Sequence, residues 1–476
     1  MNCTNQHSLE LKNFHESFRF HREIFLVSGT VKNSCLIDFI EIRRVNDGAH
    51  WRVPLFGKSF KQLIRLIKNC NNNFELVYCN CQLNFILNHE SIANPKFDVQ
   101  PIYIVNENDD GKFQSPRDLI KNEIGHALVK ISLALELAQC VLSSKFNESN
   151  FEQAFVLQPC QVFQSDLDAN KARNLNQWEL YDIIAKELVS KKGPEVLEHR
   201  KFVGFLSFTK FDGLKDGEEY SYANIKSKTS ANPALGGGFL CLMGSGCFYS
   251  FPNDVEEVTD AFRNKRPVPL NEVLDDSNYR KTFGGCFATN LGTLIHEMGH
   301  CFDLAHTETG LMGNDIDYVN RFFLSENFTE ILPKRNVRSC QLMKESEGKI
   351  QQHQRFTRIK KSGGTFLEKY REQKDNDLTF FELNCLATLR FHRWFTQSQS
   401  INDLAYDESE RKIKSNIALK IVEIRELDTK NSMLVKFWSL VDEDAKEFEI
   451  PSAVLLRNVT LFAMTSRGDV LKKTLE

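Results

Sequence analysis

The chain has 476 residues, of which 41% are hydrophobic and 26% are charged, and 60 basic against 63 acidic side chains leave a net charge of −3. This balance gives no electrostatic reason to expect a nucleic-acid partner, and the hydrophobic content is that of a folded protein. The length exceeds what one hydrophobic core usually supports, so we expect several domains.

No stretch has the pattern of a signal peptide or of a membrane span. The 13 cysteines are scattered along the chain, which is typical of reduced thiols rather than of a disulfide framework. We therefore expect a cytoplasmic or nuclear protein without a membrane partner. The sequence does not indicate the oligomeric state.

Residues 1–95 predict an N-terminal β domain. Short runs such as SFRFHREIFLVSGTV and FELVYCNCQLNFIL are rich in β-branched and aromatic residues and are bounded by turn residues. This pattern is typical of a small antiparallel sandwich. Cys79 and Cys81 alternate in one of the expected strands, and we interpret them as core residues rather than as a metal or redox pair.

Residues 96–400 alternate between helical and strand-like patterns, which predicts an α/β unit. LIKNEIGHALVKISLALELAQCVL is expected to form a buried helix, and KFVGFLSFTKF a strand. A charged segment near residues 344–377 predicts an insertion, and residues 401–476 predict a C-terminal β module. The expected fold class is therefore mixed α+β or α/β and multidomain, with sandwich-like β modules flanking the central domain.

The stretch TLIHEMGHCFDLAHTETGLMG contains the candidate metal ligands and the candidate catalytic base of the central domain. His296 and His300 are four residues apart, so on a helix they share one face within reach of a single metal ion. Glu297 is the neighbour of a ligand rather than a ligand itself, which leaves its carboxylate able to take a proton from a zinc-activated water. The pattern predicts a zinc centre that hydrolyses amide bonds.

His306 is the expected third ligand, although Asp303 and Glu308 stay open as alternatives. Six residues after His300, His306 cannot lie on the same helical face unless the chain turns sharply between them. Metzincins place glycine in this turn, within HExxHxxGxxH. Asp303 stands there instead, and aspartate tolerates the left-handed conformation.

Met312 follows His306 by six residues. It is a candidate for the methionine turn that lies beneath the metal in metzincins, or it is a core residue. An extended substrate often pairs with a strand edge beside such a cleft, and residues 236–243 are the candidate strand. Its three glycines also fit a tight turn.

Four segments resemble a known family: GGGFLCLMGSGCFYSFP, the triplet Asp275-Asp276-Ser277, the histidine stretch quoted above, and DIDYVNRFF. Together they are similar to the metzincin-like family of zinc metallopeptidases described in fungi and invertebrates. The resemblance implies a metzincin-like core and one zinc ion. It implies ligation by His296, His300 and His306, with Glu297 as the general base and Met312 in the methionine turn.

These observations lead to one main hypothesis and two alternatives. The main hypothesis is a zinc-dependent endopeptidase acting on protein or peptide substrates. The first alternative is a zinc-stabilised interaction module in which catalysis is lost or latent, and the second is an amide hydrolase that acts on something other than peptides. Retention of Glu297 favours the enzyme, because a purely structural zinc site does not need a base.

Overall fold

The computed structural model covers most of the chain. It describes residues 6–12, 18–119, 121–147, 152–326, 328–334, 377–399, 403–427, 432–451 and 458–475. Apart from Asp377, the insertion expected near residues 344–377 lies outside the described residues.

The contacts divide the chain into two compact units. One contains Met1–Met298 with Asp317–Pro333, and the other contains Gly299–Ile316 with Lys334–Glu476. The mixed α/β character with several sheets is confirmed. The division into domains 1–95, 96–400 and 401–476 stays a prediction.

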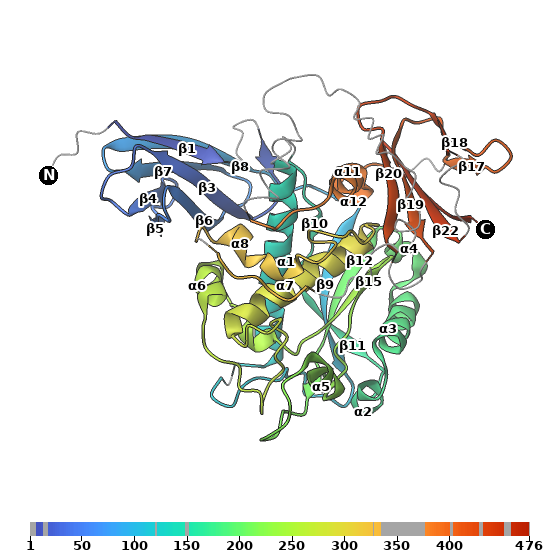
Figure 1. Cartoon of the computed structure of the whole chain (residues 1–476), viewed down its shortest axis with the longest axis horizontal. Coiled ribbons are helices and arrows are strands. Elements are labelled where there is room, and N and C mark those ends of the chain that lie inside the picture. Colours follow the sequence, from blue (N-terminus) through green and yellow to red (C-terminus); the bar gives the residue numbers. More distant parts are fainter. Residues whose placement is uncertain are drawn as a thin grey trace. The chain divides into compact units, whose positions relative to one another are not determined.

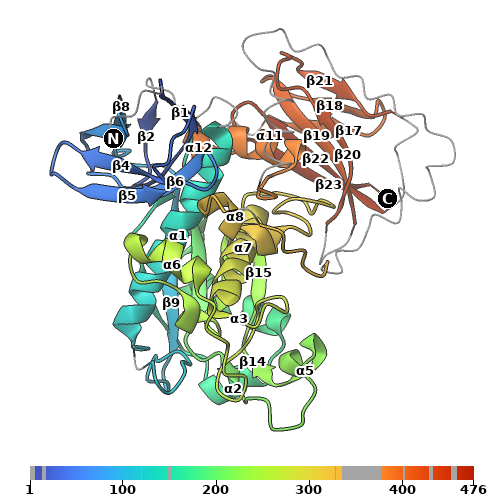
Figure 2. The same cartoon turned by 60° about the vertical axis from the view of Figure 1, so that its left-hand side comes forward.

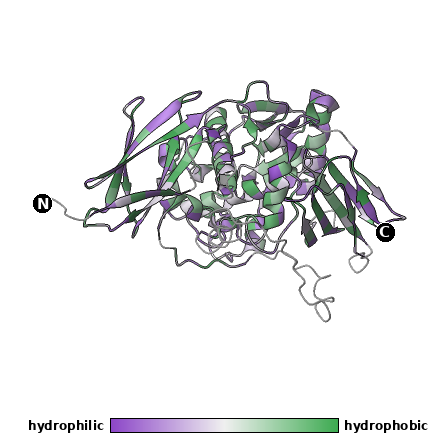
Figure 3. Cartoon of the chain, turned by 90° about the horizontal axis from the view of Figure 1, so that it is seen from above, coloured by the Kyte–Doolittle hydropathy of each residue, from purple (hydrophilic) through white to green (hydrophobic). Residues whose placement is uncertain are grey.

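The first strands of the chain form two sheets around one apolar core. The smaller sheet contains β1 (Ser8–Lys12), β3 (Ile24–Lys32) and β6 (Ser59–Arg65). The larger sheet contains, in spatial order, β2 (Arg19–Phe20), β8 (Cys81–His89), β7 (Asn71–Tyr78), β4 (Phe39–Arg44) and β5 (His50–Pro54). Buried and more exposed positions alternate along β7, and both hydropathy colours occur along these strands (Figure 3). Alternation of this kind buries one face of each sheet.

Cys79 does not lie in a strand, which corrects the expectation that Cys79 and Cys81 share one strand face. It occupies the turn between β7 and β8, and its φ angle is 54°. Tyr78 pairs with Cys81 across this turn. The run FELVYCNCQLNFIL is therefore a hairpin, and its period of two is interrupted at Cys79.

The central sheet of the first unit is largely parallel. Its strands, in spatial order, are β10 (Val156–Leu157), β9 (Asp98–Asn106), β12 (Arg200–Leu206), β16 (Leu240–Gly244) and β15 (Ala234–Gly237), with β11 (Gln161–Ser165) also paired to β9 (Figure 1). β15 runs antiparallel to β16 and forms the edge of this sheet in the described part of the chain. Residues 236–243 are thus not one strand, because the chain turns at Gly238, whose φ angle is 54°.

Helices cover the central sheet. Leu180, Ile184 and Leu188 of one helix pack against alternate residues of β9, β12 and β16. That helix begins with a capping box between Asn176 and Glu179. The helices of this unit are α1 (Ile124–Asn147), α2 (Ala169–Arg173), α3 (Gln177–Lys192), α4 (Pro194–Leu197), α5 (Tyr222–Ser227), α6 (Val258–Arg263), α7 (Phe283–Cys301) and α8 (Asn320–Phe323).

Short elements join these helices and strands. The two-stranded pair is β13 (Lys210–Phe211) with β14 (Thr229–Ser230), and the 3-10 helices are Phe248–Ser250, Val255–Glu257 and Ile316–Tyr318. Helix α1 is apolar over Ile124–Phe146, with a mean hydropathy of 1.5, and within the described residues it alone has the length and composition of a membrane span. Because 78% of that stretch is buried and α1 contacts β3 and β9, its apolar surface is accounted for by the core.

In its described residues, the second unit contains the C-terminal strands and the helices α11 and α12 that precede them (Figure 2). The larger sheet contains, in order, β20 (Leu434–Ser439), β19 (Leu419–Glu426), β22 (Val459–Thr465) and β23 (Val470–Leu475). The smaller sheet contains β17 (Ala405–Asp407), β18 (Lys412–Lys414) and β21 (Glu447–Glu449). Helices α11 (Leu383–Phe391) and α12 (Arg393–Thr396) precede both sheets, and α11 packs on β19, β20 and β22.

Candidate metal centre

Helix α7 carries the first two candidate ligands. Leu291, Leu294 and Ile295 of this helix are completely buried, as the spacing of apolar residues predicts. His296 is buried at 8% exposure, whereas His300 is half-buried. The helix is thus anchored by its apolar side while two imidazoles are presented one turn apart.

His296, His300 and His306 come together as a group. One nitrogen from each ring lies within 4.8 Å of the nitrogens offered by the other two. The Nε2 atoms of His300 and His306 are 3.1 Å apart. Two nitrogens bound to one tetrahedral zinc ion at about 2.1 Å lie about 3.4 Å from each other, so this separation fits a shared metal.

The backbone selects the nitrogen with which His300 can bind. Its Nδ1 lies 3.0 Å from the carbonyl oxygen of Leu304, so the Nδ1–H donates to that oxygen. The lone pair then resides on Nε2, the atom that faces His306. A second hydrogen bond of this kind fixes the tautomer and the ring orientation of a metal ligand.

Asp303 adopts the conformation that the turn after α7 requires. Its φ angle is 65°, in the left-handed region that glycine occupies in the metzincin motif. Its carboxylate accepts a hydrogen bond from Lys472 Nζ at 2.5 Å and lies 3.4 Å from His392 Nε2. Its carbonyl oxygen accepts a hydrogen bond from Arg425 at 2.8 Å. The carboxylate is thus engaged away from the histidine group.

His306 is held by the residues that lead into strand β20. Its N–H donates to the carbonyl oxygen of Ser432, and its carbonyl oxygen accepts from the N–H of Leu434, both at 3.0 Å. These bonds form an isolated parallel bridge between His306 and Met433. The third histidine is therefore positioned by residues more than a hundred positions away, for which the sequence offers no local signal.

Met312 lies against the last turns of α7. It is completely buried, and its carbonyl oxygen accepts a hydrogen bond from the N–H of Thr307 at 2.9 Å. A Cβ atom added to Gly299 would lie 2.4 Å from Met312 Sδ. The glycine before His300 thus leaves the space that the methionine sulfur fills. Its assignment to a methionine turn stays a prediction.

Glu297 lies beside the edge strand β15. Its side chain is half-buried, and a Cβ atom added to Gly236 would lie 1.8 Å from the carbonyl oxygen of Glu297. The strand and the helix approach so closely that only glycine fits at residue 236. Gly237, the next residue, meets nothing closer than the hydroxyl of Tyr181 at 3.9 Å.

Other residues of the segments that resemble the family lie outside the histidine group. The hydroxyl of Tyr318 accepts a hydrogen bond from the N–H of Leu332, and its ring packs under Arg321. Asp275 is buried and accepts hydrogen bonds from the hydroxyl of Tyr220 and the N–H of Ser277. Glu308 is exposed and does not belong to the group formed by the three histidines.

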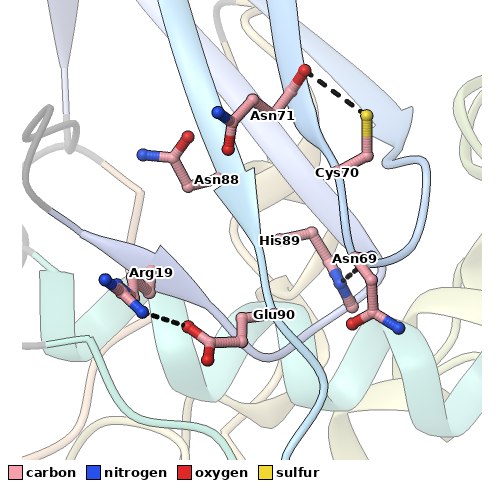
Figure 4. Close-up of a pocket in the computed structure, with 7 residues that line it drawn as sticks. All are labelled: Arg19, Asn69, Cys70, Asn71, Asn88, His89 and Glu90. Carbon is pink, nitrogen blue, oxygen red and sulfur yellow. Dashed lines mark hydrogen bonds and ion pairs between the residues drawn. The ribbon is translucent and has the colours of Figure 1, made fainter.

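A pocket of about 430 Å³ lies elsewhere, on the N-terminal sheets (Figure 4). Arg19 and Glu90 form an exposed ion pair at 2.6 Å on its wall. His89 accepts a hydrogen bond from the N–H of Asn69, and burial lowers the pKa of His89. Its remaining lining residues are Cys70, Asn71 and Asn88. This wall offers polar contacts but no group of converging metal ligands.

Comparison with known proteins places the chain in a family. Residues 8–377 match the model of a family described as "Putative peptidase family". The chain belongs to this family. The resemblance to zinc metallopeptidases drawn from the sequence motifs is thereby confirmed.

Two fungal relatives carry the name "Putative zinc metalloproteinase". The Schizosaccharomyces pombe protein is 24% identical over 252 residues, which cover 48% of this chain and 39% of the relative. The Saccharomyces cerevisiae protein is 34% identical over 97 residues, which cover 20% of this chain and 14% of the relative. The chain thus spans less than half the length of these relatives.

Among solved structures, the crystal structure of wild-type OgpA from Akkermansia muciniphila is matched over 81% of this chain and 95% of that chain. The sequence identity is 11% and the TM-score is 0.40. A TM-score of this size does not establish a common fold.

Proposed function

We propose that the protein is a zinc-dependent endopeptidase with a metzincin-like core that cleaves protein or peptide substrates. One observation carries the proposal: three imidazoles lie within 4.8 Å of one another, and Glu297 is adjacent to one of them on the same helix. Membership of a peptidase family and the zinc metalloproteinase names of the fungal relatives support it.

His296, His300 and His306 are the ligands that we propose for zinc. Imidazole nitrogen is a preferred donor for this ion, and three histidines with an open fourth position are typical of catalytic rather than structural zinc. When bound there, zinc supplies a Lewis acid that polarises a carbonyl group and acidifies a water molecule. The hydrogen bond from His300 to Leu304 keeps that ring oriented for binding.

Glu297 is the proposed general base. Its carboxylate takes a proton from the attacking water and delivers it to the nitrogen of the leaving amine. The half-buried position of this side chain keeps it within reach of a substrate, while the close contact between Gly236 and the Glu297 backbone fixes its point of attachment. General acid–base catalysis of this kind contributes a factor of about 10² to 10⁴ in rate.

The edge strand β15 is the proposed guide for an extended substrate. β15 pairs with β16 on one side, and in the described part of the chain its other edge has no strand partner. A peptide can add to such an edge through main-chain hydrogen bonds, which bind substrates of many sequences. This arrangement supports endopeptidase activity.

We also propose that the protein is cytoplasmic or nuclear, because the described cysteines are free thiols.

The proposal is tested by measuring zinc content and cleavage of a peptide library for the wild type and for Glu297→Gln. Both proteins should hold zinc at the histidine group, and cleavage by the variant should fall by about 10² to 10⁴. Glu195→Gln is a matched control, because it makes the same chemical change at an exposed residue of α4. It should retain zinc and cleavage.

Two results would count against the proposal. A wild type that binds zinc but cleaves no peptide would favour the zinc-stabilised interaction module. Cleavage that survives in Glu297→Gln would remove this glutamate from the proton transfer.

A further inference from the structure

A second group of candidate metal ligands lies in the N-terminal sheets, apart from α7. His7, Cys35 and Cys79 each offer one ligand atom, and these atoms lie within 4.8 Å of one another. His7 is buried, whereas both cysteines are half-buried. Imidazole and thiolate are donors that zinc and copper(I) prefer.

Three separate segments of the sandwich supply this group. His7 directly precedes β1, Cys35 lies in the loop between β3 and β4, and Cys79 lies in the turn between β7 and β8. The first residue adjoins a strand of the smaller sheet, and the last adjoins two strands of the larger sheet. A metal ion held by all three would therefore tie the two sheets together at one end.

His7 has the second hydrogen bond that is typical of a metal-binding histidine. Its Nδ1 lies 2.5 Å from the carbonyl oxygen of Asn33, so the Nδ1–H donates to that oxygen and the lone pair resides on Nε2. The side-chain amide of Asn33 donates in turn to the carbonyl oxygen of Gln6 at 3.1 Å. The segment that carries His7 is thus fixed to the loop that leads to Cys35.

Tyr78 contacts both His7 and the loop that carries Cys35. Its hydroxyl accepts a hydrogen bond from the N–H of Cys35 at 2.9 Å and donates to the carbonyl oxygen of Ile37 at 3.0 Å. The ring of His7 packs edge-on against Tyr78, with 5.1 Å between the ring centroids. One aromatic side chain therefore sets the positions of His7 and of the Cys35 loop.

Cys79 occupies a backbone conformation that cysteine seldom adopts. Its φ angle of 54° costs about 1 to 2 kcal/mol relative to a residue that tolerates the left-handed region. Glycine or asparagine is usual in such turns. Backbone strain of this kind clusters at functional sites.

We propose that His7, Cys35 and Cys79 form a second metal site, which binds one thiophilic cation, Zn²⁺ in the first place, and closes one end of the N-terminal sandwich. Binding converts two thiols to thiolates and releases two protons, with no change in oxidation state. Both cysteines are partly exposed to solvent, and a water as fourth ligand would complete the tetrahedral coordination that zinc prefers. This site does not depend on the proposed peptidase activity.

The test is the metal content of the full chain, purified under reducing conditions, in the wild type, Cys79→Ser and Cys35→Ser. The wild type should hold two zinc ions and each variant one, with cleavage of peptides unchanged. Cys81→Ser is the matched control, because Cys81 is half-buried on the same hairpin but does not belong to the group. It should hold two zinc ions.

Cobalt(II) substitution separates the two centres, because only a thiolate site gives sulfur-to-cobalt charge-transfer absorption. That absorption should be present in the wild type and in His300→Ala and absent from Cys79→Ser, with circular dichroism verifying that each variant is folded. One bound copper ion lost in Cys79→Ser and Cys35→Ser would support the site and assign it to copper. A single zinc ion unaffected by both substitutions would overturn the proposal, as would a Cys35–Cys79 disulfide found by mass spectrometry of the reduced preparation.

Discussion

The two histidine-containing groups of this chain are built in opposite ways. His296, His300 and His306 lie within eleven residues, and a helix followed by one turn brings them together. His7, Cys35 and Cys79 lie in three segments that only the tertiary structure of the sandwich brings together. A metal site whose ligands follow a helical spacing can therefore be predicted from the sequence. A site assembled from separate loops leaves no such spacing.

The largest effect is expected for His300→Ala, which should affect the histidine group and not the group of His7, Cys35 and Cys79. His300→Ala should remove the zinc of the histidine group and abolish peptide cleavage, while the N-terminal group retains its ion. Loss of a residue that hydrogen-bonds to a metal ligand weakens metal binding by about 10- to 100-fold. Loss of the ligand itself should weaken zinc binding by more. Metal analysis and a cleavage assay give the result, with the exposed His50→Ala as control. Loss of both metal ions would show that the groups are not independent.

The second prediction tests whether the contact between Gly236 and the Glu297 backbone positions the helix that carries His296 and His300. Gly236→Ala should destabilise the protein by about 1 to 3 kcal/mol and reduce cleavage, because the new methyl group would collide with the Glu297 backbone. Gly237→Ala should be nearly neutral, because it meets only the Tyr181 hydroxyl at 3.9 Å. Denaturant unfolding and cleavage rates compare the two. Equal effects would show that the contact at residue 236 does not position α7.

The third prediction concerns the turn between the second and third histidines. Asp303→Gly preserves the left-handed backbone and loses the contact with Lys472, whereas Asp303→Ala loses both. Asp303→Ala should therefore be less stable than Asp303→Gly by about 1 kcal/mol. Because Lys472 is exposed, its ion pair with Asp303 contributes at most about 1 kcal/mol to the free energy of unfolding. Zinc affinity should follow the same order, and a reversed order would mean that the left-handed conformation at residue 303 does not limit the stability of the turn.

The smallest effect is expected at the loop-built group. Cys79→Asn places a residue that tolerates the left-handed region in the β7–β8 turn, so without metal it should match or exceed the wild type in stability by up to about 1 kcal/mol. With zinc added, both proteins should gain stability through the histidine group, and the wild type should gain more because it binds a second ion at His7, Cys35 and Cys79. Thermal unfolding with and without zinc compares them. An equal gain in the two proteins would contradict the role of Cys79.

Much of the candidate metal centre could be predicted from the sequence because its geometry is local. The four-residue spacing placed His296 and His300 on one face of α7, and the need for a turn drew attention to Asp303, whose φ angle is 65°. The contacts of Asp303 with His392 and Lys472 could not be found in this way. Nor could the bonds from Ser432 and Leu434 to His306, since they depend on tertiary structure.

The fold shows the same division between local and distant information. Alternating apolar residues predicted the antiparallel strands of the N-terminal sheets, yet the same alternation misplaced Cys79, which lies in a turn. The triple glycine was consistent with both a strand and a turn, and the structure contains both: Gly236 and Gly237 end β15, and Gly238 turns the chain. Only the contact with the Glu297 backbone explains why residue 236 has no side chain.

Zinc-edge X-ray absorption of the Cys79→Ser variant tests the central claim most directly, because this variant should hold one ion at the histidine group alone. We expect nitrogen or oxygen ligands at about 2.0 to 2.2 Å with the scattering pattern of imidazole, and no sulfur. A sulfur ligand at about 2.3 Å, or a variant without zinc, would contradict the assignment of His296, His300 and His306 as the ligands of the peptidase zinc.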